Sequence, residues 1–365
     1  MLQRLILNGF KSIKTMDIEL RSLNILIGAN GAGKSNLISF FKMLNEMMSG
    51  RLQQYIGISG YAQSLLHFGP KVTPQIEAQL EFHVKTEILI YSMRLFHAAG
   101  DRLIFAEEEF TWRFSETKSI PPMTSSLGAG HQETKINESA EAGRETAQVL
   151  KLLLNNCRVY HFHDTSANAR VRQSCYVGDN HSLMPDAGNL AALLLRFRED
   201  HTIAYHRIVK TIRLIAPFFD DFVLEPRRNN IILNWREKGS DEVFGPHQFS
   251  DGTLRAICLT ALLLQPEDEL PALIIVDEPE LGLHPYALNV VAAMFGKASY
   301  HTQILISTQS SSFLDNFNPE DVITVNRQGK ESQFERLNPE ELEAWLEEYS
   351  LGEIWEKNIM GGGPH

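Results

Sequence analysis

Residues 28–35 read Gly28-Ala29-Asn30-Gly31-Ala32-Gly33-Lys34-Ser35 and match the phosphate-loop pattern GxxxxGKS at every fixed position. The apolar residues 23–27 before them predict a short buried strand, and the apolar spacing after Asn36 predicts a helix. A loop in this setting points backbone N–H groups and the positive end of a helix toward a polyphosphate. The alternative is a glycine turn without a ligand, which leaves the agreement of both flanks unexplained.

The loop and the start of its helix supply the candidate nucleotide-binding residues, which are Asn30, Gly31, Ala32, Gly33, Lys34, Ser35 and Asn36. The ammonium of Lys34 is expected to bridge the β- and γ-phosphates, so Lys34 is also a candidate catalytic residue. The hydroxyl of Ser35 is expected to ligate Mg²⁺. We therefore expect ATP and Mg²⁺ as cofactors.

A second chemical motif follows the apolar run 272–276, whose composition is typical of a buried parallel strand. The run ends in Asp277-Glu278-Pro279. In P-loop ATPases a strand in this place brings its first acid to the Mg²⁺ ion, which makes Asp277 a candidate metal ligand. Glu278 can then polarise the attacking water, an assistance worth roughly 10²–10⁴-fold. The alternative is a strand with two acids at its solvated end.

Composition excludes several classes of protein. The chain has 365 residues, 43% hydrophobic and 22% charged, as expected of a globular protein. Its net charge of -11 argues against a uniformly basic nucleic-acid binder. The three cysteines show no CxxC spacing, which favours free thiols in a reducing compartment. The sequence shows neither a leader-like segment nor an apolar run of membrane length, so we expect a cytoplasmic protein without membrane contact.

Hydropathy patterns along the chain predict an α/β organisation. Alternating apolar residues predict antiparallel strands between 76 and 114, with a turn at 99–101. Residues 115–146 lose this pattern and are rich in turn formers, which predicts a mobile loop. Helices are expected within 186–219 and at 253–264, the latter nearly all apolar and therefore buried.

Several conspicuous segments favour structural interpretations. The acidic run 107–109 is expected to be solvated, and the glycine-rich residues 361–365 are expected to form a flexible tail. The spacing His161, His163 and Asp164 suggests a metal site, but a structural or lobe-coupling role is favoured because no thiol pair joins it. The arginines within 196–228 alternate with acids, which favours a solvated face over a DNA-binding one.

Phe249-Ser250-Asp251-Gly252-Thr253 stands at the expected start of the buried helix. One interpretation makes Ser250 an ordinary N-cap. The order of motifs favours another. The phosphate loop, this segment, Asp277-Glu278 and the strand 303–309 follow one another as they do in ABC-type ATPases. There, the serine and glycine of such a segment bind the γ-phosphate held by a second subunit, through exposed backbone donors and a helix dipole.

The chain resembles the SMC/RecF-type branch of ABC ATPases, close to the prokaryotic predicted AAA-family ATPases akin to the ATPase part of overcoming-lysogenization-defect (OLD) proteins. The resemblance spans essentially the whole chain and rests on residues 7–12, 28–35, 249–253, 277–285 and 307–309. It implies a head-to-head homodimer that sandwiches two ATP molecules. Each site would combine the loop, Asp277 and Glu278 of one subunit with Ser250 and Gly252 of the other. The resemblance adds Lys11 as a nucleotide contact and Gln309 as the catalytic switch residue.

The same resemblance implies a P-loop NTPase fold of the ABC-type ATPase head. Residues 1–165 and 266–365 are expected to form a nucleotide-binding lobe around a mixed β-sheet, and residues 166–265 a helical lobe that carries the signature. The implied setting is DNA transactions, repair or antiviral defence against phage. A separately encoded effector is the expected partner, with DNA as a further candidate.

Two residues depart from the family pattern. Gln309 stands where His is usual, and an amide can donate a hydrogen bond but cannot carry a proton. Asp251 stands where many signatures have Gly. Both departures keep open the alternative of a slow or non-hydrolysing ATP-dependent dimer switch that recruits a partner. Asp164 and Gln173 are the candidates for the metal-contacting residue of the Q-loop.

Two other functions find less support. A GTPase is disfavoured because the sequence lacks the guanine-specificity motif NKxD. A nuclease within this chain is disfavoured because few residues follow 309 and no acidic metal cluster stands outside the ATP motifs. No long heptad segments separate the two halves, so a long-armed SMC protein is not expected.

Overall fold

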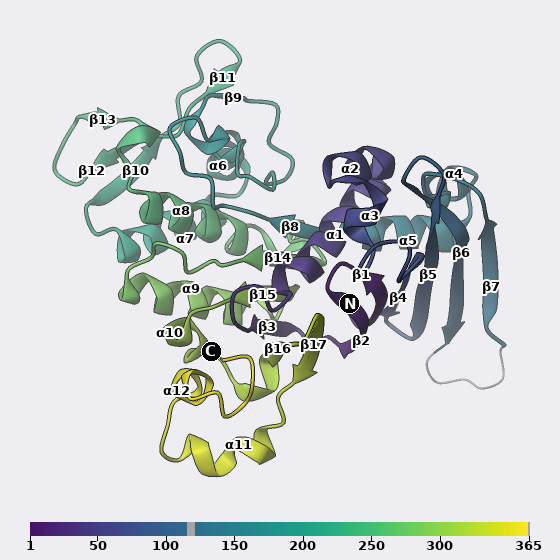
Figure 1. The fold of residues 1–365 in the computed structure, drawn as a ribbon. Coiled ribbons are helices and arrows are strands. Elements are labelled where there is room, and N and C mark those ends of the chain that lie inside the picture. Colours follow the sequence, from purple (N-terminus) through teal and green to yellow (C-terminus); the bar gives the residue numbers. More distant parts are fainter. Residues whose placement is uncertain (115–120, 364–365) are drawn as a thin grey trace.

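The computed structural model describes residues 1–114 and 121–363, and two six-stranded sheets form the framework of this part (Figure 1). The first is antiparallel in the order β2-β1-β4-β5-β6-β7, and its strands are β1 (Leu2–Phe10), β2 (Ile13–Glu19), β4 (Gln75–Val84), β5 (Glu87–Ala98), β6 (Arg102–Phe114) and β7 (Met123–Gly128). The second has the order β17-β16-β3-β15-β14-β8, and its strands are β3 (Leu23–Ile27), β8 (Cys157–Tyr160), β14 (Leu273–Asp277), β15 (Gln303–Thr308), β16 (Val322–Gln328) and β17 (Glu331–Arg336). Only its β16–β17 hairpin is antiparallel.

The second sheet is covered on both faces, which explains why its central strands are continuous apolar runs. Ile25 and Ile27 of β3 face one core, whereas Leu26 faces the other. Helix α1 (Lys34–Met48) packs between this sheet and the first sheet. Helices α8 (Asp251–Leu263) and α9 (Pro285–Ala298) cover the opposite face (Figure 1). The phosphate loop therefore lies where a buried strand passes into a buried helix.

The region from 166 to 265 is not purely helical. Besides α8 it contains α6 (Leu190–Asp200) and α7 (Thr202–Ile215), together with the short strands β9 (Cys175–Tyr176), β10 (Phe219–Val223), β11 (Asn230–Ile231), β12 (Asn234–Glu237) and β13 (Val243–Phe244). Strands β10, β12 and β13 form one small sheet, and β9 pairs with β11. Trp235 of β12 stacks on Phe249 with ring centroids 4.4 Å apart. This stacking fixes Phe249, the first residue of the expected signature segment.

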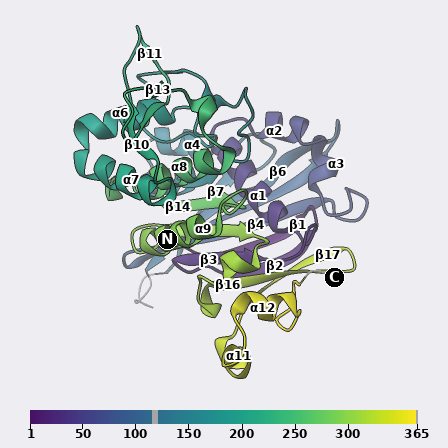
Figure 2. The same ribbon diagram turned by 90° about the vertical axis from the view of Figure 1, so that its left-hand side faces the viewer.

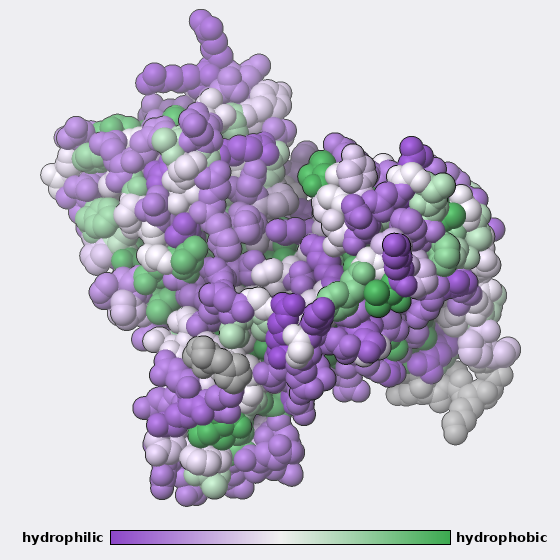
Figure 3. Space-filling model, viewed as in Figure 1, coloured by the Kyte–Doolittle hydropathy of each residue, from purple (hydrophilic) through white to green (hydrophobic). Residues whose placement is uncertain are grey.

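The remaining helices are short, and they are α2 (Leu52–Ile58), α3 (Tyr61–Leu65), α4 (Ile136–Glu141), α5 (Glu145–Asn155), α10 (Ser311–Leu314), α11 (Pro339–Leu346) and α12 (Leu351–Glu356). Figure 2 shows α11 and α12 projecting beyond β16 on one side of the molecule. The face of the molecule drawn in Figure 3 is largely hydrophilic, with scattered apolar side chains. Within residues 1–114 and 121–363, no helix combines the length and apolar character needed to cross a membrane.

The predicted α/β fold with a mixed sheet is confirmed. The strand before the loop, the helix after it, the antiparallel strands and the turn at 99–101 all form where the sequence predicts them. Each of these elements has a local sequence signal. The strands show alternating apolar residues, α1 shows apolar residues at helical spacing, and the turn contains Gly100, which has positive φ.

The predicted mobile loop at 115–146 is wrong for residues 121–146, and residues 115–120 lie outside the described part. Strand β7 pairs with β6 and closes the edge of the first sheet, while α4 and the start of α5 follow it. The polar composition misled the prediction because β7 is an edge strand, with most of its side chains exposed. Its stability comes from pairing with β6 rather than from apolar alternation.

The predicted solvation of residues 107–109 is wrong for Glu108, whose exposed fraction is 0%. The Glu108 carboxylate accepts hydrogen bonds from the Tyr91 hydroxyl at 2.8 Å, from the backbone N–H of Lys135 at 3.0 Å and from the Thr134 hydroxyl, and it contacts His131 Nε2 at 2.8 Å. One buried acid thus ties the segment 131–135 to the sheet. Buried charge is retained only where such partners exist.

The predicted flexible tail is wrong for residues 361–363, and residues 364–365 lie outside the described part. The indole Nε1 of Trp355 donates to the Gly362 carbonyl at 2.8 Å. The same glycine packs close to Ile27 and Gly28, where β3 enters the phosphate loop. Gly362 has φ of 71°, which favours glycine, and a Cβ on Gly363 would lie 2.8 Å from the Trp355 carbonyl.

We predict that Glu108→Ala lowers the free energy of unfolding by about 2–4 kcal/mol, because it leaves several buried donors without an acceptor. Urea denaturation followed by circular dichroism measures the change. The matched control is Glu109→Ala, which removes a neighbouring carboxylate that has no hydrogen bond within the described residues and should cost less than about 0.5 kcal/mol. Equal midpoints for the two variants would show that the Glu108 carboxylate does not anchor the 131–135 segment.

Candidate functional site

The phosphate loop requires glycine at its last position before the lysine. Gly33 has φ of 123°, which only glycine adopts readily, and a Cβ there would lie 2.1 Å from Ser332 Oγ. Asn30 and Ser35 are exposed at the loop and at the start of α1. Asn36 turns away from the loop, and its amide donates to Ser12 Oγ at 2.5 Å. Asn30, Gly31 and Ser35 are thus exposed, whereas the Asn36 side chain is engaged elsewhere.

The β16–β17 hairpin holds the loop from behind. Arg327 donates to the Gly31 carbonyl at 3.0 Å, and the Ser332 hydroxyl donates to the Ala32 carbonyl at 2.5 Å. Ser332 Oγ also lies 2.6 Å from Ser12 Oγ, which joins the β1–β2 turn to the same support. The hairpin thus binds the carbonyls of Gly31 and Ala32 and fixes this half of the loop. The sequence gives no local signal for these contacts, since the hairpin lies some three hundred residues further along.

Lys34 is buried, with an exposed fraction of 5%. Its ammonium donates to the carbonyls of Gly28 at 2.5 Å and Ala29 at 3.2 Å. Burial lowers the pKa of Lys34, while the nearby carboxylates of Glu278, Asp277 and Glu280 act in the opposite direction. The charge of Lys34 is therefore held by neutral carbonyls and lies near the acids at the end of β14 and in the turn after it.

Strand register brings the acids to the loop. Asp277 at the end of β14 stands beside Ser307 of β15, and Thr308 of β15 stands beside Ile27 of β3. These parallel strands end at one edge, which brings Asp277 near enough to Lys34 for its charge to oppose the lowering of that lysine's pKa by burial. The backbone carbonyl of Asp277 contacts His163 Nε2 at 2.8 Å. This contact joins the segment after β8 to the end of β14.

Glu278 adopts a strained backbone, with φ of 44°. Its N–H donates to the Ser307 carbonyl at 2.7 Å, which fixes the turn after β14. The side-chain amide of Gln309 donates to the Glu278 carboxylate. Gln309 thus contacts the expected catalytic acid directly.

Glu280 completes this arrangement, although its position in the sequence predicts no role for it. Its carboxylate accepts from the Thr308 hydroxyl at 2.5 Å and from the Gln309 N–H at 3.2 Å. Burial raises the pKa of Glu280. The acid therefore ties the end of β15 to the turn after β14 and so sets the position of Gln309.

The signature segment begins helix α8, and Ser250 is its N-cap, accepting from the Thr253 N–H at 3.2 Å. A Cβ on Gly252 would lie 2.2 Å from the Gly282 carbonyl, so only glycine permits this contact. Within the described residues, no hydrogen bond or ion pair joins 250–252 to the loop at 28–36. The two motifs therefore share no direct polar contact within one chain.

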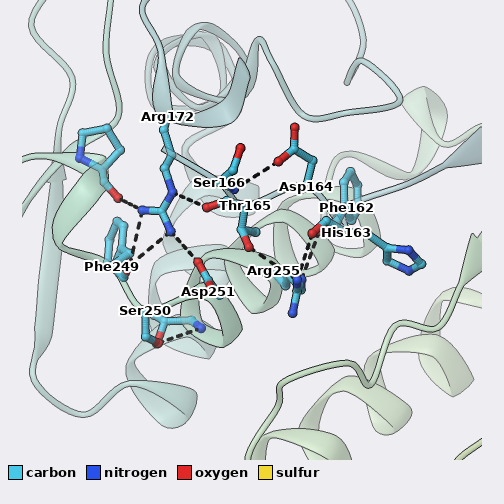
Figure 4. A network of polar contacts seen from close by, with 12 residues as sticks. Phe162, His163, Asp164, Thr165, Ser166, Arg172, Phe249, Ser250, Asp251 and Arg255 are labelled. Carbon is cyan, nitrogen blue, oxygen red and sulfur yellow. Dashed lines mark hydrogen bonds and ion pairs between the residues drawn. The ribbon is translucent and has the colours of Figure 1, made fainter. Parts of the chain in front are cut away.

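Two arginines join the signature to the segment after β8 (Figure 4). Arg172, 4% exposed, donates to the carbonyls of Thr165 and Phe249 at 2.8 and 3.3 Å and pairs with Asp251 at 2.8 Å. This pairing directs the Asp251 carboxylate toward an arginine. Arg255 of α8 donates to the carbonyls of His163 at 2.8 Å and Leu281 at 2.9 Å. Sequence patterns do not reveal buried arginines that bind carbonyls.

Other predicted residues lie outside the cluster. Lys11 donates to Ser39 Oγ at 2.6 Å, beyond the first turn of α1, and burial lowers its pKa. The Q-loop candidates are engaged in local turns: Asp164 accepts from the Ser166 N–H at 3.0 Å, and Gln173 donates to the Ala167 carbonyl at 3.0 Å. In the described part of the chain, no three His, Cys, Asp or Glu side chains are grouped so that they could hold a metal ion.

The chain is similar to one protein family in sequence and to solved structures in fold. Residues 23–315 match the family described as "AAA domain, putative AbiEii toxin, Type IV TA system". The crystal structure of an SMC head bound to the C-winged helix domain of ScpA superposes with a TM-score of 0.62 at 14% identity, covering 94% of this chain and 99% of that one. An SMC head with an extended coiled coil, bound to the C-terminal domain of ScpA derived from Pyrococcus furiosus, gives 0.62 at 13% identity, covering 95% and 98%. No curated protein sequence matches the chain.

These similarities confirm the expected P-loop NTPase fold of the SMC-head kind. At such low sequence identity, the two solved structures are evidence for the fold alone.

We predict that Lys34→Ala weakens ATP binding at least about 100-fold, because it removes the buried cation that faces the phosphate site. Titration calorimetry with ATP and Mg²⁺ measures the affinity. Lys71→Ala, which removes an exposed lysine, is the control and should bind as the wild type does. Wild-type affinity in the Lys34 variant would contradict the assignment of the loop.

Proposed function

The chain belongs to the family described as "AAA domain, putative AbiEii toxin, Type IV TA system", and from this premise we propose that it binds and hydrolyses ATP as a head-to-head dimer. The observation that carries the proposal is the shared edge at which the phosphate loop, Asp277, Glu278 and Gln309 meet. Positive charge from Lys34 and oxygen donors from Ser35 and Asp277 occur there together. This is the set of groups that a magnesium-bound triphosphate requires.

The donors fit the expected ligands. Ser35 and Asp277 offer hard oxygen atoms, the kind that Mg²⁺ prefers, and they would hold the ion. When bound, Mg²⁺ neutralises charge on the β- and γ-phosphates. Lys34 would exchange its two carbonyl contacts for phosphate oxygens, which form stronger, charge-assisted hydrogen bonds.

Glu278 is the proposed group that polarises the attacking water. Its carboxylate is oriented by the Gln309 amide, and Gln309 is in turn held by Glu280. A glutamine in this place keeps the same hydrogen-bonding pattern at any pH, since its amide does not titrate. In this proposal Gln309 positions the acid, and the proton from water passes to Glu278 alone.

The dimer is proposed because the two motifs share no polar contact within one chain. Ser250 and Asp251 are exposed and Gly252 is half-buried, while the Thr253 N–H is already bound by the Ser250 hydroxyl. The N–H groups of Asp251 and Gly252, together with the helix dipole, favour an anion. A second copy would supply these donors to the triphosphate held by the loop of the first. The proposed lobes are residues 1–165 with 266–365, and residues 166–265, joined by the hydrogen bonds from Arg172 to the Thr165 carbonyl and from Arg255 to the His163 carbonyl.

The biological setting is proposed from resemblance. Both SMC heads were crystallised with a domain of another protein, ScpA. By analogy, we propose that ATP-driven closure of this dimer acts on a separately encoded effector, in DNA transactions or defence against phage. DNA remains a further proposed partner.

One observation favours the second candidate function, an ATP-dependent switch with slow or no hydrolysis. The Glu278 carboxylate is already bound by Gln309, and an amide cannot relay the proton. In that case ATP would close the dimer and recruit the partner, and turnover would be incidental.

We predict that the wild type releases phosphate from ATP in steady state and that Glu278→Gln lowers the rate roughly 10²–10⁴-fold, because it removes the general base. A coupled phosphate-release assay measures the rate, and ATP affinity, measured in parallel, should be preserved. The switch function is favoured instead if the wild type shows only stoichiometric release. A variant that turns over at the wild-type rate would exclude Glu278 as the base.

We predict that Ser250→Arg leaves ATP binding by the monomer intact but prevents ATP-driven dimerisation, because a bulky side chain occupies the start of α8. Multi-angle light scattering with ATP and Mg²⁺ in the Glu278→Gln background reports the mass. The control is Ser240→Arg, a half-buried serine that follows the turn after β12. If the Ser250 variant still dimerises, the signature does not act across subunits.

A further inference from the structure

A cavity of about 550 Å³ lies on the flank of α1, away from the phosphate loop, which precedes the first residue of this helix. It is bounded by the second half of α1, by α2 and by the strand β8 with its following residues. Figure 3 shows the surface hollowed between the α2 part of the molecule and the region of α6 and β9. Cavities of this size with apolar walls and a few polar groups are typical of small-ligand sites.

Positive charge in this cavity is not balanced. Lys42 reaches it from α1 and has no hydrogen bond or ion pair to any residue in 1–114 or 121–363. The carboxylate that lies closest in sequence, Glu46, is engaged by Arg51 at 2.7 Å. Burial, and then the charge of Lys42, lower the pKa of His161 to about 4, and the charge of Lys42 also contributes to the lowered pKa of Lys11. A ligand with a negative group would therefore be attracted to Lys42.

The opposite walls are apolar. Val159, Pro185 and the ring of Tyr55 line the cavity, and Ile58 stands at its rim with an exposed fraction of 80%. The Tyr55 hydroxyl is 2.9 Å from Ser39 Oγ, which keeps the ring in place. A flat, weakly polar group fits such walls, whereas an inorganic anion would leave them unused.

We propose that this cavity is a second ligand site, which binds a nucleotide unit with its phosphate on Lys42 and its base against Val159, Tyr55 and Pro185. The unit is either a free mononucleotide or the phosphorylated end of a strand, since both present the same chemistry. The overall charge of -11 does not oppose a small ligand as strongly as a long polyanion.

The cavity is connected to the ATP site. The rings of His161 and His163 lie 4.2 Å apart, and His163 Nε2 contacts the carbonyl of Asp277 at 2.8 Å. A ligand beside His161 is thus two side chains from the expected Mg²⁺ ligand. The second part of the inference rests on the proposed ATPase function: a ligand in this cavity regulates ATP turnover.

The test uses the full chain with its ATP site first saturated with a non-hydrolysable ATP analogue and Mg²⁺. Uridine 5′-monophosphate and a 5′-phosphorylated uridine dinucleotide are then titrated by calorimetry. We expect one site per chain, with affinity lowered at least about tenfold in Lys42→Glu, because the charge that faces the phosphate is reversed. The matched control is Lys210→Glu, which reverses an exposed lysine on α7. Ile58→Glu at the rim is a second variant that leaves the core unchanged, and it should weaken binding as well.

The probes separate the two sources of ligand. Tighter binding of the dinucleotide supports a strand end, and equal or weaker binding supports a free nucleotide. The proposal is overturned if neither probe binds, if the ATP analogue displaces the probe, or if Lys42→Glu and Ile58→Glu bind as Lys210→Glu does.

A phosphate-release assay tests the regulatory part. Uridine 5′-monophosphate should change the wild-type rate at least about twofold and leave the Lys42→Glu rate unchanged. No change in the wild type would remove the regulatory role. Failure of the ATP analogue to bind, with Lys42-dependent binding of uridine 5′-monophosphate, would overturn the ATPase proposal and leave the second site standing.

Discussion

The position of every group in the candidate ATP site depends on the parallel register of β3, β15 and β14. Because the side chains at the ends of these strands meet at one edge, the phosphate loop, Gln309 and the acids Asp277 and Glu278 are brought together from segments far apart in the chain. A slip of one residue in β14 would turn Asp277 to the other face of the sheet. The continuous burial of both faces prevents that slip, since each strand is packed against two cores.

A second principle is that buried cations near the site are held by carbonyl oxygens. Lys34 binds the carbonyls of Gly28 and Ala29, and Arg172 and Arg255 bind carbonyls on either side of the signature. Neutral carbonyls satisfy a buried charge without cancelling it. Lys34 therefore keeps its attraction for phosphate, while the two arginines keep the signature fixed to the segment that reaches Asp277 through His163.

Much of the fold and part of the site follow from sequence because their signals are local. The phosphate loop, the apolar run before Asp277 and the spacing of α1 each lie within one element. What escaped prediction depends on distant partners: Glu108 is buried by donors from 131–135, Ser332 supports a loop three hundred residues away, and Arg172 joins three segments. Gly362, likewise, packs against Gly28 from the far end of the sequence. Composition alone describes such residues as solvated or flexible.

The most direct test of a composite site is a crystal structure of the Glu278→Gln variant with ATP and Mg²⁺. Two copies should face each other, with Ser250 and the N–H of Gly252 from one copy within hydrogen-bond distance of the γ-phosphate held by Lys34 of the other. A structure in which a single chain encloses the triphosphate, with α8 of every copy turned away from it, would contradict the composite site.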